Sequence, residues 1–477
     1  MEKRIFYNYT SILKKLAEYL PSRGLVILNS FFILPIFAYI LSPYEVSVYL
    51  IALQVLNIFC TCSFDWTSKA VLRFYEKYNI QGRLNVFLST IFWLSVIVYV
   101  ILFCSYFVFK DILQVKFAVN NVIFLLTLFL VIPCGIRQTL YNILRIKNNY
   151  SLYTISIILY QFLFVAGFLA IVNVIPNAIS IMIAMITAIF VIDAYIMFSI
   201  KLKYPIERNF DKNIVYEILK YSLPLVVTNI CYWSIFNIPK FIFQASNQYL
   251  NTSIYGISWS LASGIIAPLA GLFMFVNFPV IIKNFEKHRA VKDYFTNVIQ
   301  LYLFILTPII CGLFFFSKDI VKLIFPSAYA GIGVLIPIFA VVIFLHELLK
   351  LFNIKYHLNI KTHIEMIIGI ITVLTFVFLT LNIFEKYSIL LAALIMLVTE
   401  IVLIFANIFV KFKNQVKLEY LKLLRNFLWM ITISVISALL SNLVFNYNFN
   451  MIIVIKVVLY LVLSYVVFYT LRRRVLD

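Results

Sequence analysis

Ionisable side chains that interrupt long apolar stretches are the residues of this sequence best placed to do chemistry. Arg23, Asp65 and Arg137 each lie in such a stretch. In lipid, an ionisable group is costly unless it faces a partner or a hydrated cavity. Because a guanidinium group binds phosphate oxygens through paired hydrogen bonds, Arg23 and Arg137 are candidate ligands for an anionic substrate, and Asp65 is expected to position Arg23. The alternative is a structural Arg23–Asp65 ion pair, with Arg137 extended to the membrane surface.

Three further charged residues suit a transport process. Lys240 follows Pro239 and is another candidate cation for the substrate, or else it extends to the membrane surface. Asp193 and Glu400 stand in corresponding late apolar segments of the two halves of the chain. Each can carry a coupling proton or sodium ion, and a buried structural pairing is the alternative.

The glycines, histidines and cysteines of this sequence do not form a catalytic or metal-binding motif. The 11 glycines are scattered without a phosphate-binding loop, and the four histidines fall at or near the ends of apolar segments and form no ligand set. The six cysteines show neither metal-ligand nor disulfide spacing. We therefore expect a protein that is not an enzyme, with no metal site and no cofactor other than a coupling ion.

Long apolar segments dominate the chain and must position these residues. Hydrophobic residues make up 64% of the chain and charged residues 12%, against about 25% charged in a soluble domain. A segment of about 20 apolar residues crosses a bilayer, and in lipid it has to be a helix. The predicted fold is an all-α polytopic membrane protein. Its fourteen predicted spans are 17–41, 47–68, 84–109, 119–144, 150–173, 177–200, 219–243, 252–282, 296–317, 329–350, 363–384, 387–410, 421–445 and 450–471.

The basic residues indicate how these spans are oriented. Of the 39 lysines and arginines, 30 fall on the side of the first and last segments and 6 on the opposite side, Lys240 among the latter. Excess positive charge marks the cytoplasmic side of short loops. We expect both termini in the cytoplasm, location in a bacterial inner membrane, and contact of the basic loops with lipid headgroups and not with nucleic acid.

A repeated proline pattern indicates two related halves. Pro21 and Pro35 in the first span correspond to Pro224 and Pro239 in the seventh. Broken helices at matching positions are typical of transporters built from repeats, and an even number of spans per half makes the repeats parallel. The predicted parts are an N-terminal six-helix lobe (1–200), a cytoplasmic linker (201–218), a C-terminal six-helix lobe (219–410), and a basic linker with two appended helices (411–477).

With this orientation, Arg23, Asp65 and Arg137 come from three helices of one half and fall at one depth, in the cytoplasmic third of the membrane. The predicted site is a hydrated, net positive pocket that is open to the cytoplasm. A diphosphate headgroup suits such a pocket.

Six short sequence patterns occur in a fixed order along the chain. They are Leu41–Tyr49, Phe64–Thr67 with Arg73–Tyr75, Leu219–Pro224, Ile254–Ile257, Ile324–Tyr329, and Leu381–Asn382 with Ala392–Ala393. Together they resemble the polysaccharide repeat-unit flippases (O-antigen, Wzx-type) of the multidrug/oligosaccharidyl-lipid/polysaccharide (MOP) exporter superfamily. Ser47 and Thr67 stand where that family usually has glycine, which departs from its closest members.

The resemblance implies two six-helix lobes around a central cavity. It also implies that an undecaprenyl-diphosphate-linked oligosaccharide moves from the cytoplasmic to the periplasmic leaflet by alternating access. The expected partners are this lipid-linked oligosaccharide, membrane lipids and other polysaccharide-assembly proteins. Rival interpretations are a lipid II flippase, a multidrug or cation antiporter, which should show an acidic cavity, and a polysaccharide polymerase, which should show a long periplasmic loop.

Overall fold

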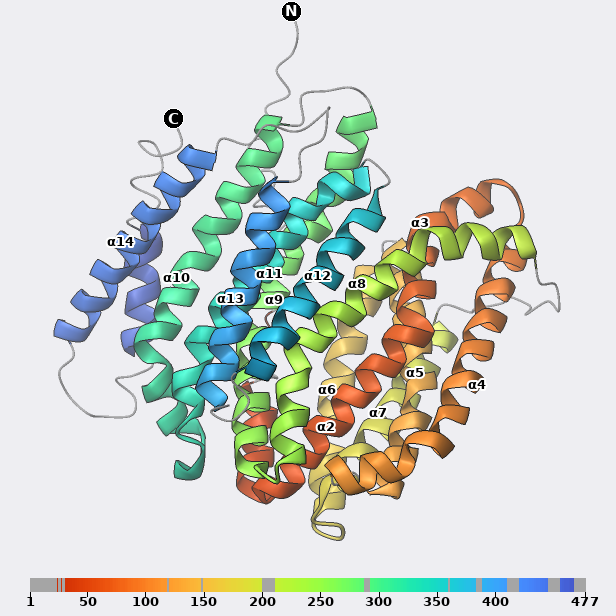
Figure 1. Ribbon diagram of the computed structural model, residues 1–477, viewed down its shortest axis with the longest axis horizontal. Helices are drawn as coiled ribbons and strands as arrows, with labels where there is room; N and C mark the ends of the chain where they lie inside the picture. Colours follow the sequence, from red (N-terminus) through yellow and green to blue (C-terminus); the bar gives the residue numbers. More distant parts are fainter. Residues whose placement is uncertain are drawn as a thin grey trace, which may run out of the picture. The chain divides into compact units, whose positions relative to one another are not determined.

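The structure, a computed structural model, describes most of the chain. The described residues are 24, 27, 31–117, 120–146, 149–199, 211–286, 292–358, 361–382, 388–409, 420–444 and 455–466. Within these ranges the regular elements are all helical (Figure 1). The helices are α2 (Pro43–Cys60), a π-helical turn (Thr61–Asp65), α3 (Trp66–Ile80), α4 (Leu84–Phe117), α5 (Asn121–Ile146), α6 (Tyr150–Val172), α7 (Ala178–Ser199), α8 (Lys212–Ala245), α9 (Tyr249–Glu286), α10 (Lys292–Ile324), a 3-10 turn (Ser327–Tyr329), α11 (Ile332–Leu358), α12 (Thr362–Asn382), α13 (Ile389–Phe409) and α14 (Tyr420–Val444).

The helices have the length and composition of membrane spans. Among the described residues, 11 helices are long and apolar enough to cross a membrane, and three shorter apolar helices occupy Phe31–Ile40, Arg425–Ser441 and Ile455–Val466. Each of these fourteen segments overlaps one predicted span, and the all-α polytopic fold is confirmed. The protein is a multi-pass integral membrane protein.

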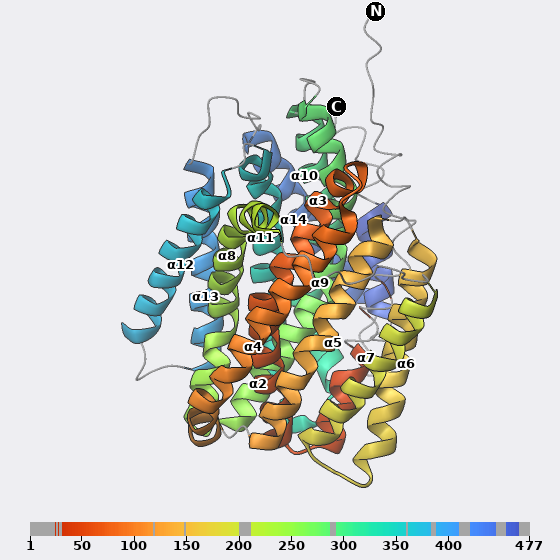
Figure 2. The same cartoon turned by 90° about the vertical axis from the view of Figure 1, so that its right-hand side faces the viewer.

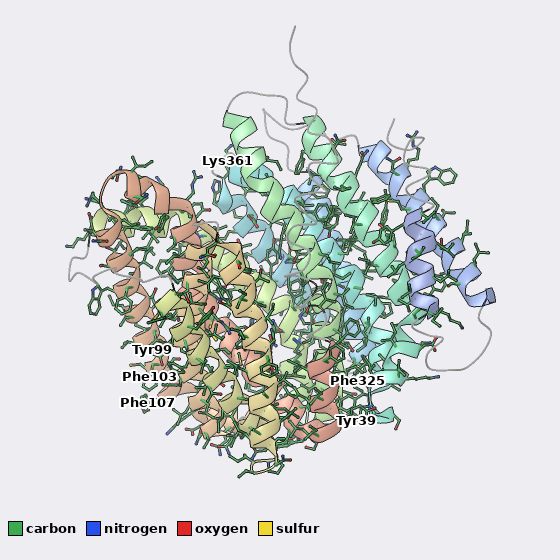
Figure 3. The ribbon with its side chains drawn as sticks, turned by 180° about the vertical axis from the view of Figure 1, so that it is seen from behind. Tyr39, Tyr99, Phe103, Phe107, Phe325 and Lys361 are labelled. Carbon is green, nitrogen blue, oxygen red and sulfur yellow. The ribbon has the colours of Figure 1, made fainter. Side chains whose placement is uncertain are left out.

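The outer surface of α4 shows why such helices need lipid around them. Tyr99, Phe103 and Phe107 follow one another along this helix at intervals of four residues (Figure 3). Phe103 is 38% exposed and Phe107 is 63% exposed. Large aromatic side chains exposed in a row would be unfavourable in water, whereas hydrocarbon accommodates them.

The chain forms two compact units. Unit 2 comprises Ile36–Gly256 and Thr362–Leu374, and unit 1 comprises the rest. In unit 2, α6 and α7 run side by side (Figure 2), and α5 packs against α2, α3 and α7. In unit 1, α11 packs against α10 and α13, and α10 packs against α14. The lobes predicted at 1–200 and 219–410 remain a prediction.

Two prolines lie within the long helix α8. Pro224 and Pro239 both fall inside Lys212–Ala245, and the helix continues through them. α8 begins at Lys212 because Asp211 caps it: the Asp211 side chain accepts hydrogen bonds from the N–H groups of Asn213 and Ile214. The last part of the predicted 201–218 linker is therefore helical. Of the matching prolines, Pro35 lies in the Phe31–Ile40 helix and Pro21 lies outside the described residues.

Candidate functional site

Two helices that pack together in unit 2 both carry irregular backbone. The π-helical turn Thr61–Asp65 joins α2 to α3, so residues 43–80 form one continuous helix with a local bulge. α5 contains Pro133, which lacks the N–H that a helix hydrogen bond needs. The helices approach closely, because a Cβ added at Gly135 would lie 2.1 Å from the Phe64 ring. π-helical turns are frequent at functional sites, which marks this region as a candidate.

Asp65 ends the π-helical turn. Its Oδ2 accepts a hydrogen bond of 3.1 Å from Thr61 Oγ1. Trp66 Nε1 donates 2.8 Å to the carbonyl of Cys62, which satisfies one carbonyl of the bulge. Within the part of the chain that the structure describes, Asp65 makes no ion pair. Its expected partner Arg23 lies outside the described residues.

Arg137 is half-buried in α5, one turn after Pro133. Its guanidinium carbon lies 4.4 Å from the ring centroid of Tyr160 on α6, and its Nη2 lies 3.9 Å from Cys134 Sγ. At about 1.5 Å per residue, Arg137 and Tyr160 lie about 14 and 15 Å from the adjoining ends of α5 and α6. The described residues provide no carboxylate that pairs with Arg137. An aromatic face and a sulfur atom therefore orient the guanidinium group, which leaves N–H donors available to a ligand.

Asp193 of α7 lies close to Arg137. The two charges interact, although no ion pair joins them. Asp193 is 5% exposed, and neither oxygen of its carboxylate has a hydrogen-bond partner among the described residues. A buried carboxylate without partners is unfavourable, so this position favours a proton, a cation or a ligand's donor group.

The structure thus brings together two residues to which the sequence analysis gave separate roles. Arg137 was predicted to bind substrate and Asp193 to couple an ion. The π-helical turn that ends at Asp65 also packs against α5. We call Arg137, Asp193 and Tyr160 the arginine cluster. Only the packing of α5 against α6 and α7 reveals it, because the three residues lie on different spans.

Lys240 is fully buried in α8. Its Nζ donates a hydrogen bond of 2.8 Å to Asn237 Oδ1, one turn earlier. One turn later, Gln244 Nε2 donates 3.0 Å to the carbonyl of Phe117 at the end of α4. Lys240 is not the loop charge that was expected, because its side chain lies on a buried polar stripe of α8. The alternative that it extends to the membrane surface is wrong for the same reason. Its role in substrate binding stays a prediction.

Glu400 of unit 1 has a partner that the sequence analysis missed. His346 Nδ1 on α11 and Glu400 Oε1 on α13 are 3.2 Å apart, and the two residues are 7% and 0% exposed. Seven residues further along both helices, Asn407 Nδ2 donates a hydrogen bond to Asn353 Oδ1. Both pairs join residues 54 apart, so α11 and α13 run parallel and in register. That shared offset is visible in the sequence once the two spans are assumed to be neighbours.

The position of His346 corrects one further expectation. The histidines were expected at or near the ends of apolar segments, whereas His346 lies in the interior of α11 and is buried. The residues that the structure describes contain no group of three or more His, Cys, Asp or Glu side chains able to hold a metal ion.

Solved structures define the class of fold. The chain is similar to lipid II flippase MurJ in an inward closed conformation, with a TM-score of 0.72 and 17% identity, over 97% of this chain and 100% of that chain. It is also similar to a multidrug resistance MATE family transporter in an outward-facing conformation (TM-score 0.60, 14% identity, 83% and 93% of the two chains). A MOP superfamily transporter from Pyrococcus furiosus gives a TM-score of 0.52 and 14% identity, over 82% and 92%. The fold is therefore the one shared by MurJ and the MATE transporters.

The sequence also matches one protein family. The model of the family described as "Polysaccharide biosynthesis protein" matches residues 36–334. The chain belongs to this family, which confirms the predicted connection with polysaccharide biosynthesis. No curated protein matches the chain by sequence.

Proposed function

We propose that this protein is a flippase for a lipid-linked oligosaccharide repeat unit. It moves an undecaprenyl-diphosphate-linked glycan from the cytoplasmic to the periplasmic leaflet of a bacterial inner membrane, by alternating access and with both termini in the cytoplasm. Membership of a polysaccharide biosynthesis family and a fold shared with a lipid flippase support the proposal. In this role the protein is a transporter of the Wzx type and not an enzyme.

The observation that carries the proposal is the orientation of Arg137. This side chain lies within a membrane span, its guanidinium packs on Tyr160, and the described residues give it no carboxylate partner. An arginine held in this way presents a planar fork of donors that matches phosphate oxygens. The diphosphate of the carrier lipid is the ligand that we assign to it, with Arg23 and Lys240 as further cationic ligands and Asp65 as the residue that positions Arg23.

Asp193 gives the site a means of coupling. A phosphate bound at Arg137 brings negative charge close to Asp193, which favours the state of Asp193 that holds a proton or a cation. Substrate binding at Arg137 therefore changes the affinity of Asp193 for a proton or sodium ion, and by linkage the reverse also holds. Glu400, paired with His346, is the second carboxylate proposed to take part in coupling.

The proposal is tested in a strain that lacks this protein, by asking which lipid intermediate accumulates and in which leaflet. We expect single undecaprenyl-diphosphate repeat units in the cytoplasmic leaflet and loss of surface polysaccharide. Unpolymerised units already in the periplasmic leaflet would instead indicate a polymerase. Accumulation of lipid II with cell lysis would indicate a peptidoglycan precursor flippase.

One observation favours a second candidate, a cation antiporter. Asp193 is a buried carboxylate whose oxygens have no hydrogen-bond partner among the described residues, and the same fold occurs in a multidrug resistance MATE family transporter. A deletion strain that shows normal polysaccharide, no lipid intermediate and increased sensitivity to cationic drugs would favour this candidate over the flippase.

A further inference from the structure

The first three turns of α8 exceed what a membrane span requires. α8 has 34 residues, which makes it about 51 Å long at 1.5 Å per residue, against about 30 Å of hydrocarbon. In Figure 1 its first turns cross the end of unit 2 near α3, and the helix then descends past α2. Pro224 lies inside the helix, 12 residues after Lys212. The segment that precedes this proline is the part in excess of a span.

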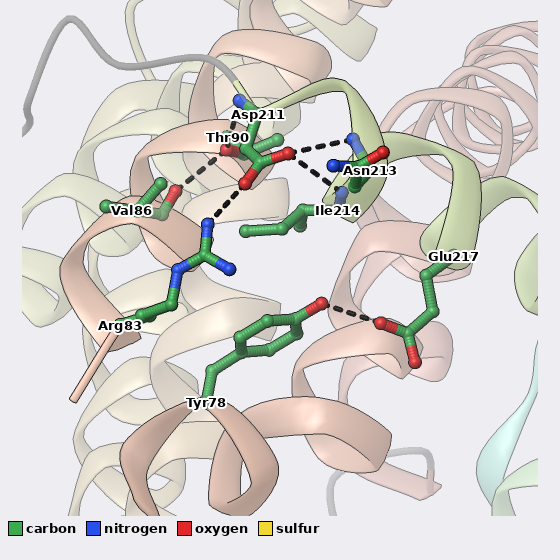
Figure 4. Close-up of polar contacts among 8 residues, drawn as sticks. All are labelled: Tyr78, Arg83, Val86, Thr90, Asp211, Asn213, Ile214 and Glu217. Atoms are coloured by element: carbon green, nitrogen blue, oxygen red, sulfur yellow. Dashed lines mark hydrogen bonds and ion pairs between the residues drawn. The ribbon is translucent and has the colours of Figure 1, made fainter. Parts of the chain in front are cut away.

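Contacts with α3 and α4 fix the level at which this segment starts. Arg83 forms an ion pair with Asp211, the residue that caps α8 (Figure 4). Arg83 directly precedes Leu84, where the apolar span Leu84–Ser105 begins. The start of α8 therefore lies beside the first residue of the span Leu84–Ser105. The edge of an apolar span is the level of the lipid headgroups.

The inner face of the segment packs against other residues of unit 2 and pairs its charges with them. Ile214 and Ile218 belong to a buried cluster that includes Tyr78 and Phe87. Glu217 accepts hydrogen bonds from Lys77 Nζ at 2.5 Å and from the Tyr78 hydroxyl at 2.6 Å. Lys77 and Arg83 thus neutralise the two acidic residues of the segment, Glu217 and Asp211.

The outer face carries positive charge and aromatic surface. Lys212, Tyr216 and Lys220 are all exposed and follow one another at intervals of four residues, which places them on one side of the helix. Tyr216 is 69% exposed, and Leu223, at the end of the same face, is 56% exposed. Lys220 Nζ lies 6.0 Å from the centroid of the Tyr216 ring. We call Lys212, Tyr216 and Lys220 the lysine–tyrosine stripe.

We infer that the lysine–tyrosine stripe is a binding surface for the headgroups of anionic membrane phospholipids. Lysine side chains at the membrane surface attract anionic lipids, tyrosine favours the interface, and Leu223 supplies an apolar contact for the acyl boundary. The two carboxylates of this segment, Asp211 and Glu217, are already paired, so they do not offset this charge. The inference does not depend on which substrate the protein transports.

The test uses the purified full-length protein in detergent with phosphatidylglycerol as the probe, and measures lipid binding by native mass spectrometry. The Lys212→Gln/Lys220→Gln variant is expected to bind phosphatidylglycerol about 25-fold more weakly, or about fivefold for each lysine. Lys212→Arg/Lys220→Arg should retain binding, because the charge remains. Phosphatidylethanolamine, which has no net charge, should not distinguish the glutamine variant from the parent protein.

A matched control is available on α10. Lys318 and Lys322 are exposed and also four residues apart, but Asp319 lies between them. Lys318→Gln/Lys322→Gln should bind phosphatidylglycerol as the parent does. Equal binding by the parent and the Lys212→Gln/Lys220→Gln variant would overturn the inference, and so would an equal loss in the α10 control.

Discussion

The α11–α13 pair of unit 1 and the arginine cluster of unit 2 both hold polar side chains between apolar helices, but they partner them differently. In unit 1, α11 and α13 match His346 with Glu400 and Asn353 with Asn407, at one constant offset. In unit 2, Arg137 rests on an aromatic ring, and the nearby carboxylate of Asp193 accepts no hydrogen bond from the described residues. Matched pairs fix the register of two helices, whereas unmatched groups remain available for a ligand or an ion.

This difference predicts that the paired polar groups contribute mainly to stability and the unpaired ones mainly to transport. Removing one member of a matched pair leaves its partner buried without compensation, so the main loss is stability. Removing a group that serves a ligand leaves the resting fold nearly unchanged, so the main loss is transport. Variants in the two units therefore separate the two roles when stability and transport are measured together.

Arg137→Ala is expected to produce the greatest change in transport. A hydrogen bond to a charged group contributes about 1.5–3 kcal/mol, so loss of the guanidinium should reduce surface polysaccharide at least about tenfold. Arg137→Lys should restore only part of the activity, because an ammonium group lacks the planar fork. The measurements are surface polysaccharide and the amount of protein in the membrane. Normal polysaccharide at a normal protein level would remove Arg137 from the site.

Glu400→Ala should lower the free energy of unfolding by about 3–5 kcal/mol, because it breaks the buried His346–Glu400 pair. The measurement is denaturant or thermal unfolding in detergent. The double variant Glu400→Ala/His346→Ala should lose much less free energy of unfolding than the sum of the losses in the two single variants. If Glu400→Ala unfolds like the parent but abolishes transport, Glu400 serves coupling, and the contrast between the two units no longer holds.

Gly135→Ala should lower the free energy of unfolding by about 1–3 kcal/mol, because the new methyl group overlaps the Phe64 ring and the core is overpacked. The matched control is Gly271→Ala in α9, where no described atom outside the local helix backbone lies within 4 Å of the added Cβ. Thermal unfolding of the two variants gives the comparison. Equal stability of the two alanine variants would show that α5 and the π-helical turn separate easily.

Asp211→Asn should have the smallest effect on stability, and this effect should depend on pH. The Asn213 N–H, followed by Arg83 and the Ile214 N–H, holds the pKa of the Asp211 carboxyl below its usual value. A lowered native-state pKa stabilises the fold at pH values above the unfolded pKa of about 3.9, and this contribution is lost as pH falls through the native value. The melting temperatures of the parent and Asp211→Asn should therefore differ at pH 7 and converge as the pH falls below the native pKa of Asp211. A constant difference across this range would contradict the assignment.

Hydropathy predicted the spans well, because an apolar stretch of the right length has few alternatives in lipid. It did not predict the start of α8, since Lys212 to Lys220 is an amphipathic stretch with three charged residues. Its helical state depends on the Asp211 cap and on packing against α3 and α4. The π-helical turn at Thr61–Asp65 has no signature in composition. The sequence identified Arg137 and Asp193 as unusual residues, but their proximity depends on which spans are neighbours. The same limit explains the missed partner of Glu400.

The constant offset between α11 and α13 also has a consequence for biosynthesis. His346 and Asn353 are synthesised 54 residues before Glu400 and Asn407 respectively. At about 5–20 residues per second, a ribosome takes about 3–11 s to add that length. During this interval α11 has to be accommodated with a histidine and an asparagine that still lack their partners. The nascent chain therefore needs water, the translocation machinery or another helix beside α11 until α13 emerges.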